Sequence, residues 1–102
     1  MYKDIKNKLI DLLAGLEYNK ILLFGSRARE ENREDSDYDV IISLKNNISN
    51  QEKLALQSKI RKAFAQDKID IDIIIKNFDE YNYQKELLGN VVYYANREGI
   101  LL

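Results

Sequence analysis

Two segments of this chain place apolar side chains at every second position, and this alternation constrains the fold more than any other feature. The apolar positions are Tyr38, Val40, Ile42 and Leu44 in residues 37–44, and Ile69, Ile71, Ile73 and Ile75 in residues 69–75. Successive side chains of a β-strand point to opposite faces, so a period of two predicts two strands that each bury one face. A buried strand face needs a second layer against it, and the chain should therefore fold as a sheet packed against other elements.

The first third of the chain predicts a helix and another strand. Residues 2–16 carry apolar side chains at spacings of three and four, which indicates an amphipathic helix. Residues 21–24 form a short apolar run that ends at Gly25, as expected of a buried strand. Residues 27–36 are almost wholly polar, so we expect at most one helical turn there, followed by an exposed loop.

The rest of the chain predicts further helices around the second of the two alternating strands. Ser49 and Glu52 fit a capping box at the start of a helix that runs to about residue 66. Residues 81–88 and 91–98 read as short helices, and Gly99 is expected to cap the second of them. The expected fold class is α/β, with a small mixed β-sheet packed against helices in the order α-β-β-α-β-α.

Composition limits both the organisation and the chemistry of the chain. Its 102 residues, with no proline and no linker-like stretch, predict a single domain over residues 1–102. The chain has no cysteine and no histidine, which excludes disulfides, thiolate or imidazole metal sites and Ser-His-Asp catalysis. A net charge of -1 argues against stable binding of nucleic acid. The chain shows neither a signal peptide nor a membrane-length apolar stretch, so we expect a soluble, cytoplasmic protein.

Four aspartates occupy the non-apolar positions of the two alternating strands, where aspartate is unfavourable. They form the pairs Asp37 with Asp39 and Asp70 with Asp72, each pair on one face. If the two strands are neighbours, these carboxylates converge, and a divalent cation would offset their mutual repulsion. Ligands that are all oxygen suit Mg²⁺ or Mn²⁺. The alternative is that all four side chains face solvent on an open side of the sheet.

A calcium site is a second interpretation of the same residues, because Asp35, Asp37 and Asp39 match the opening of an EF-hand loop. The sixth loop position requires glycine and is Val40, and the twelfth requires glutamate and is Asn46. The sequence therefore disfavours an EF-hand.

The segment after the first expected strand is a candidate phosphate site. Gly25 permits close backbone approach, Ser26 adds a hydroxyl donor, and the guanidinium groups of Arg27 and Arg29 suit bidentate contact with phosphate oxygens. The segment matches neither a Walker A loop nor a dinucleotide-binding fingerprint. An ordinary connection between a strand and a helix is the alternative.

Taken together, these motifs resemble those of the minimal nucleotidyltransferase (MNT) domains of the DNA polymerase β superfamily. The resemblance rests on Gly25-Ser26-Arg27-Ala28-Arg29, on Ser36-Asp37-Tyr38-Asp39-Val40 and on the closing Arg97-Glu98-Gly99-Ile100-Leu101, and it covers nearly the whole chain. Two positions depart from the family pattern. Glu30 stands where these domains usually have glycine, beside the expected triphosphate site, and Leu102 stands where many have tyrosine.

The resemblance implies a nucleotide and metal site. Gly25 and Ser26 would hold the triphosphate of ATP, with Arg27 and Arg29 as further nucleotide-binding residues. Three catalytic carboxylates, Asp37, Asp39 and Asp72, would bind two Mg²⁺ ions, with Mn²⁺ as an alternative. We favour Asp72 over Asp70 as the third acid because it leads directly into the apolar run 73–75, as the third acid of these domains does. Two metals can bind the attacking and leaving oxygens of an in-line displacement without any histidine.

The resemblance also implies a reaction and a partner. The chain would transfer AMP from ATP-Mg to a hydroxyl group, namely a tyrosine of a HEPN ribonuclease toxin from a neighbouring gene, and would thereby act as its antitoxin. One alternative is adenylylation of a small molecule with the help of a partner subunit. Another is a non-catalytic module that masks the toxin. Four tyrosines near the C-terminus, Tyr81, Tyr83, Tyr93 and Tyr94, are candidates for partner contact, and the alternative for most of them is ordinary packing in amphipathic helices. The acidic loop at residues 30–35 is expected to form a solvated turn.

Overall fold

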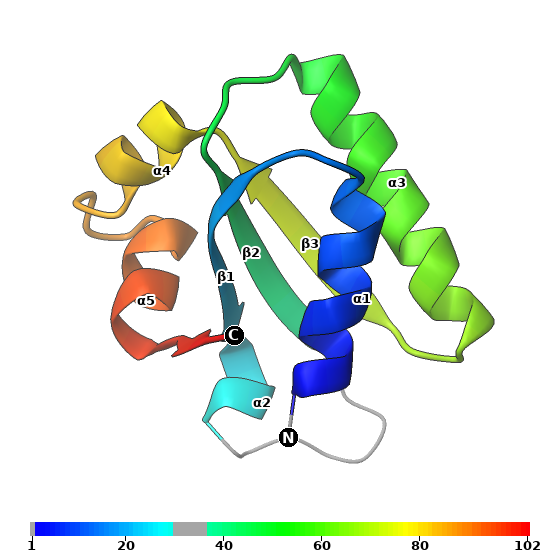
Figure 1. The fold of residues 1–102 in the computed structure, drawn as a ribbon. Coiled ribbons are helices and arrows are strands. Elements are labelled where there is room, and N and C mark those ends of the chain that lie inside the picture. Colours follow the sequence, from blue (N-terminus) through cyan, green and yellow to red (C-terminus); the bar gives the residue numbers. More distant parts are fainter. Residues whose placement is uncertain (1, 30–36) are drawn as a thin grey trace.

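A four-stranded mixed sheet in the order β3-β2-β1-β4 forms the centre of the fold (Figure 1). The structure is a computed structural model and describes residues 2–29 and 37–102. The strands are β1 (Tyr18–Phe24), β2 (Tyr38–Leu44), β3 (Ile71–Lys76) and β4 (Ile100–Leu101). Strand β1 is antiparallel to both β2 and β4, whereas β2 and β3 are parallel. The mixed sheet predicted from the sequence is thus confirmed.

Helices cover both faces of this sheet (Figure 1). They are α1 (Lys3–Leu13), α2 (Gly25–Ala28), α3 (Asn50–Gln66), α4 (Phe78–Gln84) and α5 (Val91–Glu98). Helices α1 and α3 lie on one face, α4 and α5 on the other, and the short α2 lies at the end of β1. Among the described residues, no helix has the length and apolar character needed to cross a membrane.

The two faces of the sheet build two separate cores. The larger core lies under α1 and α3 and includes the fully buried Leu9, Ile42 and Phe64. The smaller core lies under α4 and α5 and includes Ile41 and Tyr81. Because the strands bury alternate side chains in different cores, the predicted division of residues 37–44 between two faces is confirmed.

The starts of β1 and β3 differ from the sequence prediction by three and two residues, whereas the start of β2 differs by one. Strand β1 begins at Tyr18, three residues before the apolar run that predicted it, because its first residues pair with the end of β2 while still partly exposed. Strand β3 begins at Ile71 rather than at Ile69. The N–H of Ile69 donates to the carbonyl of Phe64 at 3.0 Å, so this residue closes the end of α3 and is not available to the sheet.

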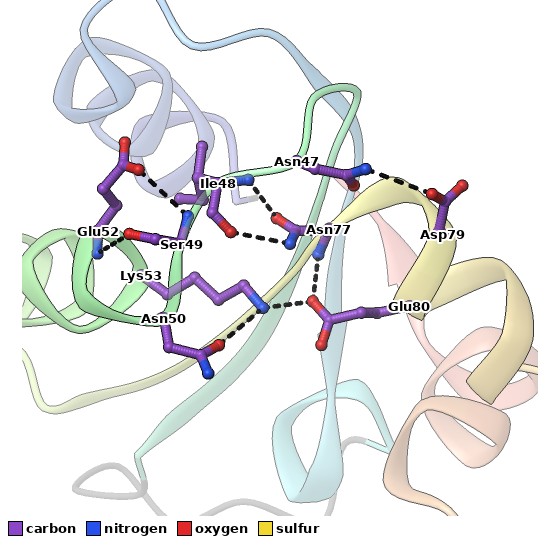
Figure 2. A network of polar contacts seen from close by, with 9 residues as sticks. All are labelled: Asn47, Ile48, Ser49, Asn50, Glu52, Lys53, Asn77, Asp79 and Glu80. Carbon is purple, nitrogen blue, oxygen red and sulfur yellow. Dashed lines mark hydrogen bonds and ion pairs between the residues drawn. The ribbon is translucent and has the colours of Figure 1, made fainter.

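Helix α4 begins at Phe78, three residues before the expected start, and ends at Gln84. The carboxylate of Glu80 accepts a hydrogen bond from the N–H of Asn77 at 3.0 Å, which caps the first turn (Figure 2). The side chain of Asn77 also joins the chain before α3, because it accepts from the N–H of Ile48 at 2.9 Å and donates to its carbonyl at 3.0 Å. The same network, together with the ion pair between Lys53 and Glu80, connects the starts of α3 and α4.

The observed order contains three elements that the expected order α-β-β-α-β-α lacked. They are the single turn of α2, a second helix after β3, and the two-residue strand β4, in which Ile100 and Leu101 pair with Leu23 and Leu22 of β1. Gly99 follows α5 as expected, but its backbone is extended, with φ of -72°. A β-carbon at Gly99 would lie 2.4 Å from the carbonyl oxygen of Ala95, so close backbone packing is the reason for glycine here.

Candidate active site

Two of the four strand aspartates lie side by side at one end of the sheet. Asp39 of β2 pairs in register with Asp72 of β3, and on its other side it pairs with Phe24, the last residue of β1. Paired residues on neighbouring strands are about 4.8 Å apart and point to the same face. That face is the one shared with Ile41 and covered by α4 and α5. The prediction that the carboxylates converge therefore holds for this pair.

The charge of Asp39 is poorly compensated by its surroundings. Burial raises the pKa of its carboxyl group, and the negative charges of Asp72 and Asp37 raise this pKa further, while Arg29 acts in the opposite direction. A carboxylate that is desolvated and repelled by its neighbours gains from a nearby cation. The oxygen donors and their electrostatics thus fit a divalent metal ion.

Gly25 packs directly against this carboxylate. Its φ is +74°, a conformation that other residues rarely adopt, and a β-carbon there would lie 2.4 Å from Oδ2 of Asp39. Glycine is therefore required both by the backbone turn and by the carboxylate beside it. As a result, the backbone of the candidate phosphate segment touches the candidate metal ligand.

Asp37 and Asp70 lie just outside the strands. Both are exposed, Asp37 directly before β2 and Asp70 directly before β3. The carbonyl of Asp70 accepts a hydrogen bond from the N–H of Tyr38 at 3.0 Å, which extends the parallel ladder by one step. Of the two candidates for the third acid, the register thus places Asp72, and not Asp70, beside Asp39.

Across residues 2–29 and 37–102, no three carboxylates gather into a group that could hold a metal ion by themselves. Asp72 is an exposed side chain, and Nη2 of Arg61 in α3 lies 4.0 Å from its Oδ1. Because Mg²⁺ is often held by one or two carboxylates together with substrate phosphates, two neighbouring aspartates are compatible with a magnesium site.

Ser26 and Arg27 in α2 are partly buried, whereas Arg29 directly after α2 is exposed. Ser26 is half-buried, and the guanidinium carbon of Arg27 lies 3.9 Å from the centre of the Tyr38 ring. Arg29 is exposed at the end of the turn. Three features of the sequence analysis lie outside the described part of the chain. They are Glu30, which stands in place of the family's glycine, Ser36 of the second motif, and the acidic loop at residues 30–35.

A cleft of about 210 Å³ opens beside Gly25, between α2 and α5. Its lining residues are Phe24, Gly25, Ala28, Arg29, Tyr94, Ala95 and Glu98. The sequence did not indicate that Tyr94 and Glu98 belong to this region, because only the packing of α5 on β1 brings them to the end of that strand. Their spacing of four residues on one helix is the only signal in the sequence that they share a face.

The four C-terminal tyrosines differ in their availability to a partner. Tyr81 is completely buried, and its hydroxyl donates to Oδ1 of Asn96 at 2.5 Å, so this tyrosine packs in the core and is not a contact for a partner. Tyr83 and Tyr94 are exposed large side chains, at 69% and 45% of their full accessible area. Tyr93 packs edge-on against Tyr94, with ring centres 5.2 Å apart.

Sequence comparison assigns most of the chain to one family model. Residues 7–98 match the model described as polymerase beta, nucleotidyltransferase. Among curated proteins, none matches the sequence significantly.

Several solved structures share the fold at low sequence identity. A toxin–antitoxin complex with AMP-PNP matches with a TM-score of 0.62 and 21% identity, over 94% of this chain and 70% of that one. A structure assigned to the minimal nucleotidyltransferases matches with a TM-score of 0.55 and 24% identity, over 98% and 91% of the two chains. A chain in the structure of the tri-AMPylated Shewanella oneidensis HEPN toxin in complex with MNT antitoxin matches with a TM-score of 0.51 and 18% identity, over 96% of this chain and 65% of that one.

Proposed function

Because this chain belongs to the polymerase β nucleotidyltransferase family, we propose that it transfers AMP from ATP-Mg²⁺ to a hydroxyl group and releases pyrophosphate. The observation that carries the proposal is the contact of Gly25 with Asp39, which is itself in register with Asp72. This arrangement joins a backbone turn suited to phosphate with a pair of carboxylates suited to a metal. A module that only binds a partner has no need of aspartates at these strand positions.

Each site residue has a proposed role in this reaction. The backbone of Gly25 and the hydroxyl of Ser26 hold the triphosphate, and Arg27 and Arg29 support nucleotide binding. Asp39 and Asp72, together with Asp37, would hold two Mg²⁺ ions, or Mn²⁺ in their place. The bound metal supplies positive charge to the phosphate oxygens and to the attacking hydroxyl.

The chemistry at the carboxylates is a single displacement at phosphorus. The acceptor oxygen forms a bond to the α-phosphorus while the bond from this phosphorus to the pyrophosphate oxygen breaks. The hydroxyl proton leaves the acceptor oxygen as the new bond forms, and Asp72 is the carboxylate proposed to help remove it. Asp72 is exposed, whereas the neighbouring Asp39 is half-buried, so an acceptor hydroxyl can approach the pair from the side of Asp72.

We propose a tyrosine of a HEPN-type ribonuclease toxin as the acceptor, and hence that the chain acts as an antitoxin. The support comes from similar folds, one described as a toxin–antitoxin with AMP-PNP and another as a tri-AMPylated HEPN toxin in complex with MNT antitoxin. Exposed apolar side chains of α4, α5 and their connection, among them Tyr83, Leu88 and Val91, offer a surface for such a partner. A small domain would then leave the selection of the acceptor to docking.

The test is to incubate the purified chain with ATP, Mg²⁺ and the HEPN protein encoded beside it, and then to determine the intact mass of the HEPN protein. We expect one or more added AMP groups with the wild-type chain and none with Asp39→Asn. Asp11→Asn is a matched control, because Asp11 lies in α1 on the opposite face of the sheet, and it should support full transfer.

The same experiment discriminates between the remaining functions. If the Asp39→Asn variant of this chain leaves the HEPN protein unmodified but still blocks its ribonuclease activity, the chain masks its partner without catalysis. Transfer of AMP to a free small molecule, with the HEPN protein unmodified, would support the small-molecule alternative and would overturn the antitoxin proposal.

A further inference from the structure

Arg27, in α2, and Arg29, directly after α2, point to different sides of the sheet. The guanidinium carbon of Arg27 lies 3.9 Å from the ring centre of Tyr38, and this ring packs against the core under α1 and α3. Arg29 instead lines the cleft beside Gly25, together with residues of α5. Asp39 and Asp72 point to the α5 side. Arg27 is therefore directed away from the carboxylates, and Arg29 lies on their side.

Tyr38 is a fixed surface for a guanidinium group. Its N–H donates to the carbonyl of Asp70 at 3.0 Å, which ties its backbone to the strand segment before β3. Its ring meets the ring of Tyr2 edge-on, with centres 6.3 Å apart. An arginine stacked on such a ring gains both a cation–π attraction and planar packing.

Helix α2 depends on contacts of this kind. It is a single turn of four residues, and a turn of this length is unstable in isolation. Tyr38 directly precedes Asp39 in β2, so a contact from Arg27 to Tyr38 connects α2 to the strand that carries the carboxylate. Gly25 approaches the same carboxylate from the start of α2.

We propose that Arg27 is a positioning residue: by stacking on Tyr38 it fixes α2 against β2, and thereby sets where Gly25 and Ser26 lie relative to Asp39, without itself contacting the phosphates. This rests on the proposed function only in that the positioned groups bind a nucleotide. Arg29 then remains the arginine of this segment that faces the substrate.

The first measurement examines α2 in the absence of nucleotide, and so does not depend on the proposed function. Backbone order parameters of residues 25–29 from NMR relaxation should fall in Arg27→Ala and in Tyr38→Leu, and should keep their wild-type values in Tyr38→Phe, which preserves the aromatic ring. Arg97→Ala is the matched control, because Arg97 stacks on Tyr93 at 4.4 Å in α5, so its removal abolishes a similar stack without touching α2. Unchanged order in Arg27→Ala would overturn the proposal.

The second measurement is the affinity for AMP-PNP in the presence of Mg²⁺, determined by calorimetry at several salt concentrations. Loss of a stack of this kind predicts an affinity about 2- to 5-fold weaker in Arg27→Ala and Tyr38→Leu. The double variant should be no weaker than either single variant, and the salt dependence should stay that of the wild type, because no charge on the phosphates is lost. Tyr38→Phe should bind like the wild type. Melting curves followed by circular dichroism verify that each variant is folded.

Two results would contradict the positioning role. Additive losses in the double variant, together with a weaker salt dependence in Arg27→Ala, would identify Arg27 as a direct phosphate ligand. Wild-type affinity in Tyr38→Leu would show that the stack has no effect on the site. If the wild-type chain itself fails to bind AMP-PNP while α2 loosens as expected, the proposed function is wrong and Arg27 still positions α2.

Discussion

A β-carbon on residue 25 would lie only 2.4 Å from Oδ2 of Asp39, so the carboxylate leaves no room for any side chain at Gly25. Gly25 also has a φ of +74°. The backbone of the turn and the carboxylate of the neighbouring strand are therefore packed closely together.

This contact predicts that Gly25→Ala damages the site more than it damages the fold. The strained φ should cost about 1 kcal/mol of unfolding free energy or more, and the methyl group should displace the Asp39 carboxylate and reduce Mg²⁺-dependent transfer by at least about 100-fold, as a misplacement of about 1 Å does. Urea unfolding and the rate of AMP transfer are the measurements.

Gly89→Ala is the matched control for this substitution. Gly89 has a φ of +93°, but a β-carbon there meets nothing within 4 Å. It should lose a similar unfolding free energy and keep its transfer rate. Equal loss of transfer in both variants would mean that backbone strain, and not the contact with Asp39, limits the reaction.

The raised pKa of Asp39 predicts how stability depends on pH. The folded protein holds this proton more tightly than the unfolded chain, whose carboxyl group titrates near 3.8. The resulting stability is present below the unfolded pKa and is lost as the pH rises through the folded pKa. Asp39→Asn should thus be more stable than the wild type at neutral pH while losing transfer activity.

Unfolding free energies measured from pH 3 to pH 7 test this prediction, and the difference between Asp39→Asn and the wild type should grow as the pH rises. Asp72→Asn should reduce the effect, because the charge of Asp72 is one cause of the raised pKa of Asp39. A wild-type protein that gains stability relative to Asp39→Asn with rising pH would contradict the expected sign.

The register of β2 with β3 predicts which acid completes the metal site. Asp72 pairs with Asp39, whereas Asp70 precedes the strand and contributes its backbone carbonyl to the sheet. We expect Asp72→Asn to abolish Mg²⁺-dependent transfer, and Asp70→Asn to retain most of it because its backbone bond is unchanged. The opposite order of activities, measured at saturating Mg²⁺, would assign the third acid to Asp70.

Asn77 predicts a stability effect at the opposite end of β3 (Figure 2). Its side chain bonds both backbone groups of Ile48, so Asn77→Ala leaves a partly buried N–H and a carbonyl without this partner and should cost about 1–3 kcal/mol of unfolding free energy. Asn47→Ala is the control, because Asn47 makes an exposed bond to Asp79 at 3.3 Å and its loss should cost less than about 0.5 kcal/mol. Equal losses in the two variants would contradict the role of Asn77.

Periodicity in the sequence was sufficient to predict which residues of β2 and β3 face each core, because strand side chains alternate strictly. It could not predict that Asp39 and Asp72 are neighbours, since register depends on which strands pair. The start of α4 was missed although Asn77 and Glu80 form a recognisable capping signal. Strand β4, with only Ile100 and Leu101, is too short to have a period.

The direction of Arg27 was equally inaccessible to the sequence. Arg27 and Arg29 differ by two positions and were expected to act together on the nucleotide. Residues that are two positions apart in a helical turn are separated by about 200° around the helix axis, so their side chains point to nearly opposite sides. Which side faces the carboxylates depends on how the turn joins β1, and that requires the three-dimensional structure.

The in-register row of Phe24, Asp39 and Asp72 has a consequence for how such a protein can diverge. The separation of these side chains is set by the hydrogen-bonded spacing of three adjacent strands, a property of the backbone that nearly any sequence of strand-forming residues reproduces. Helix surfaces, loops and even core residues can therefore drift while the distances within the row persist. Natural variation and protein engineering both have wide freedom outside the row, provided that the pairing of β1, β2 and β3 does not slip by a residue.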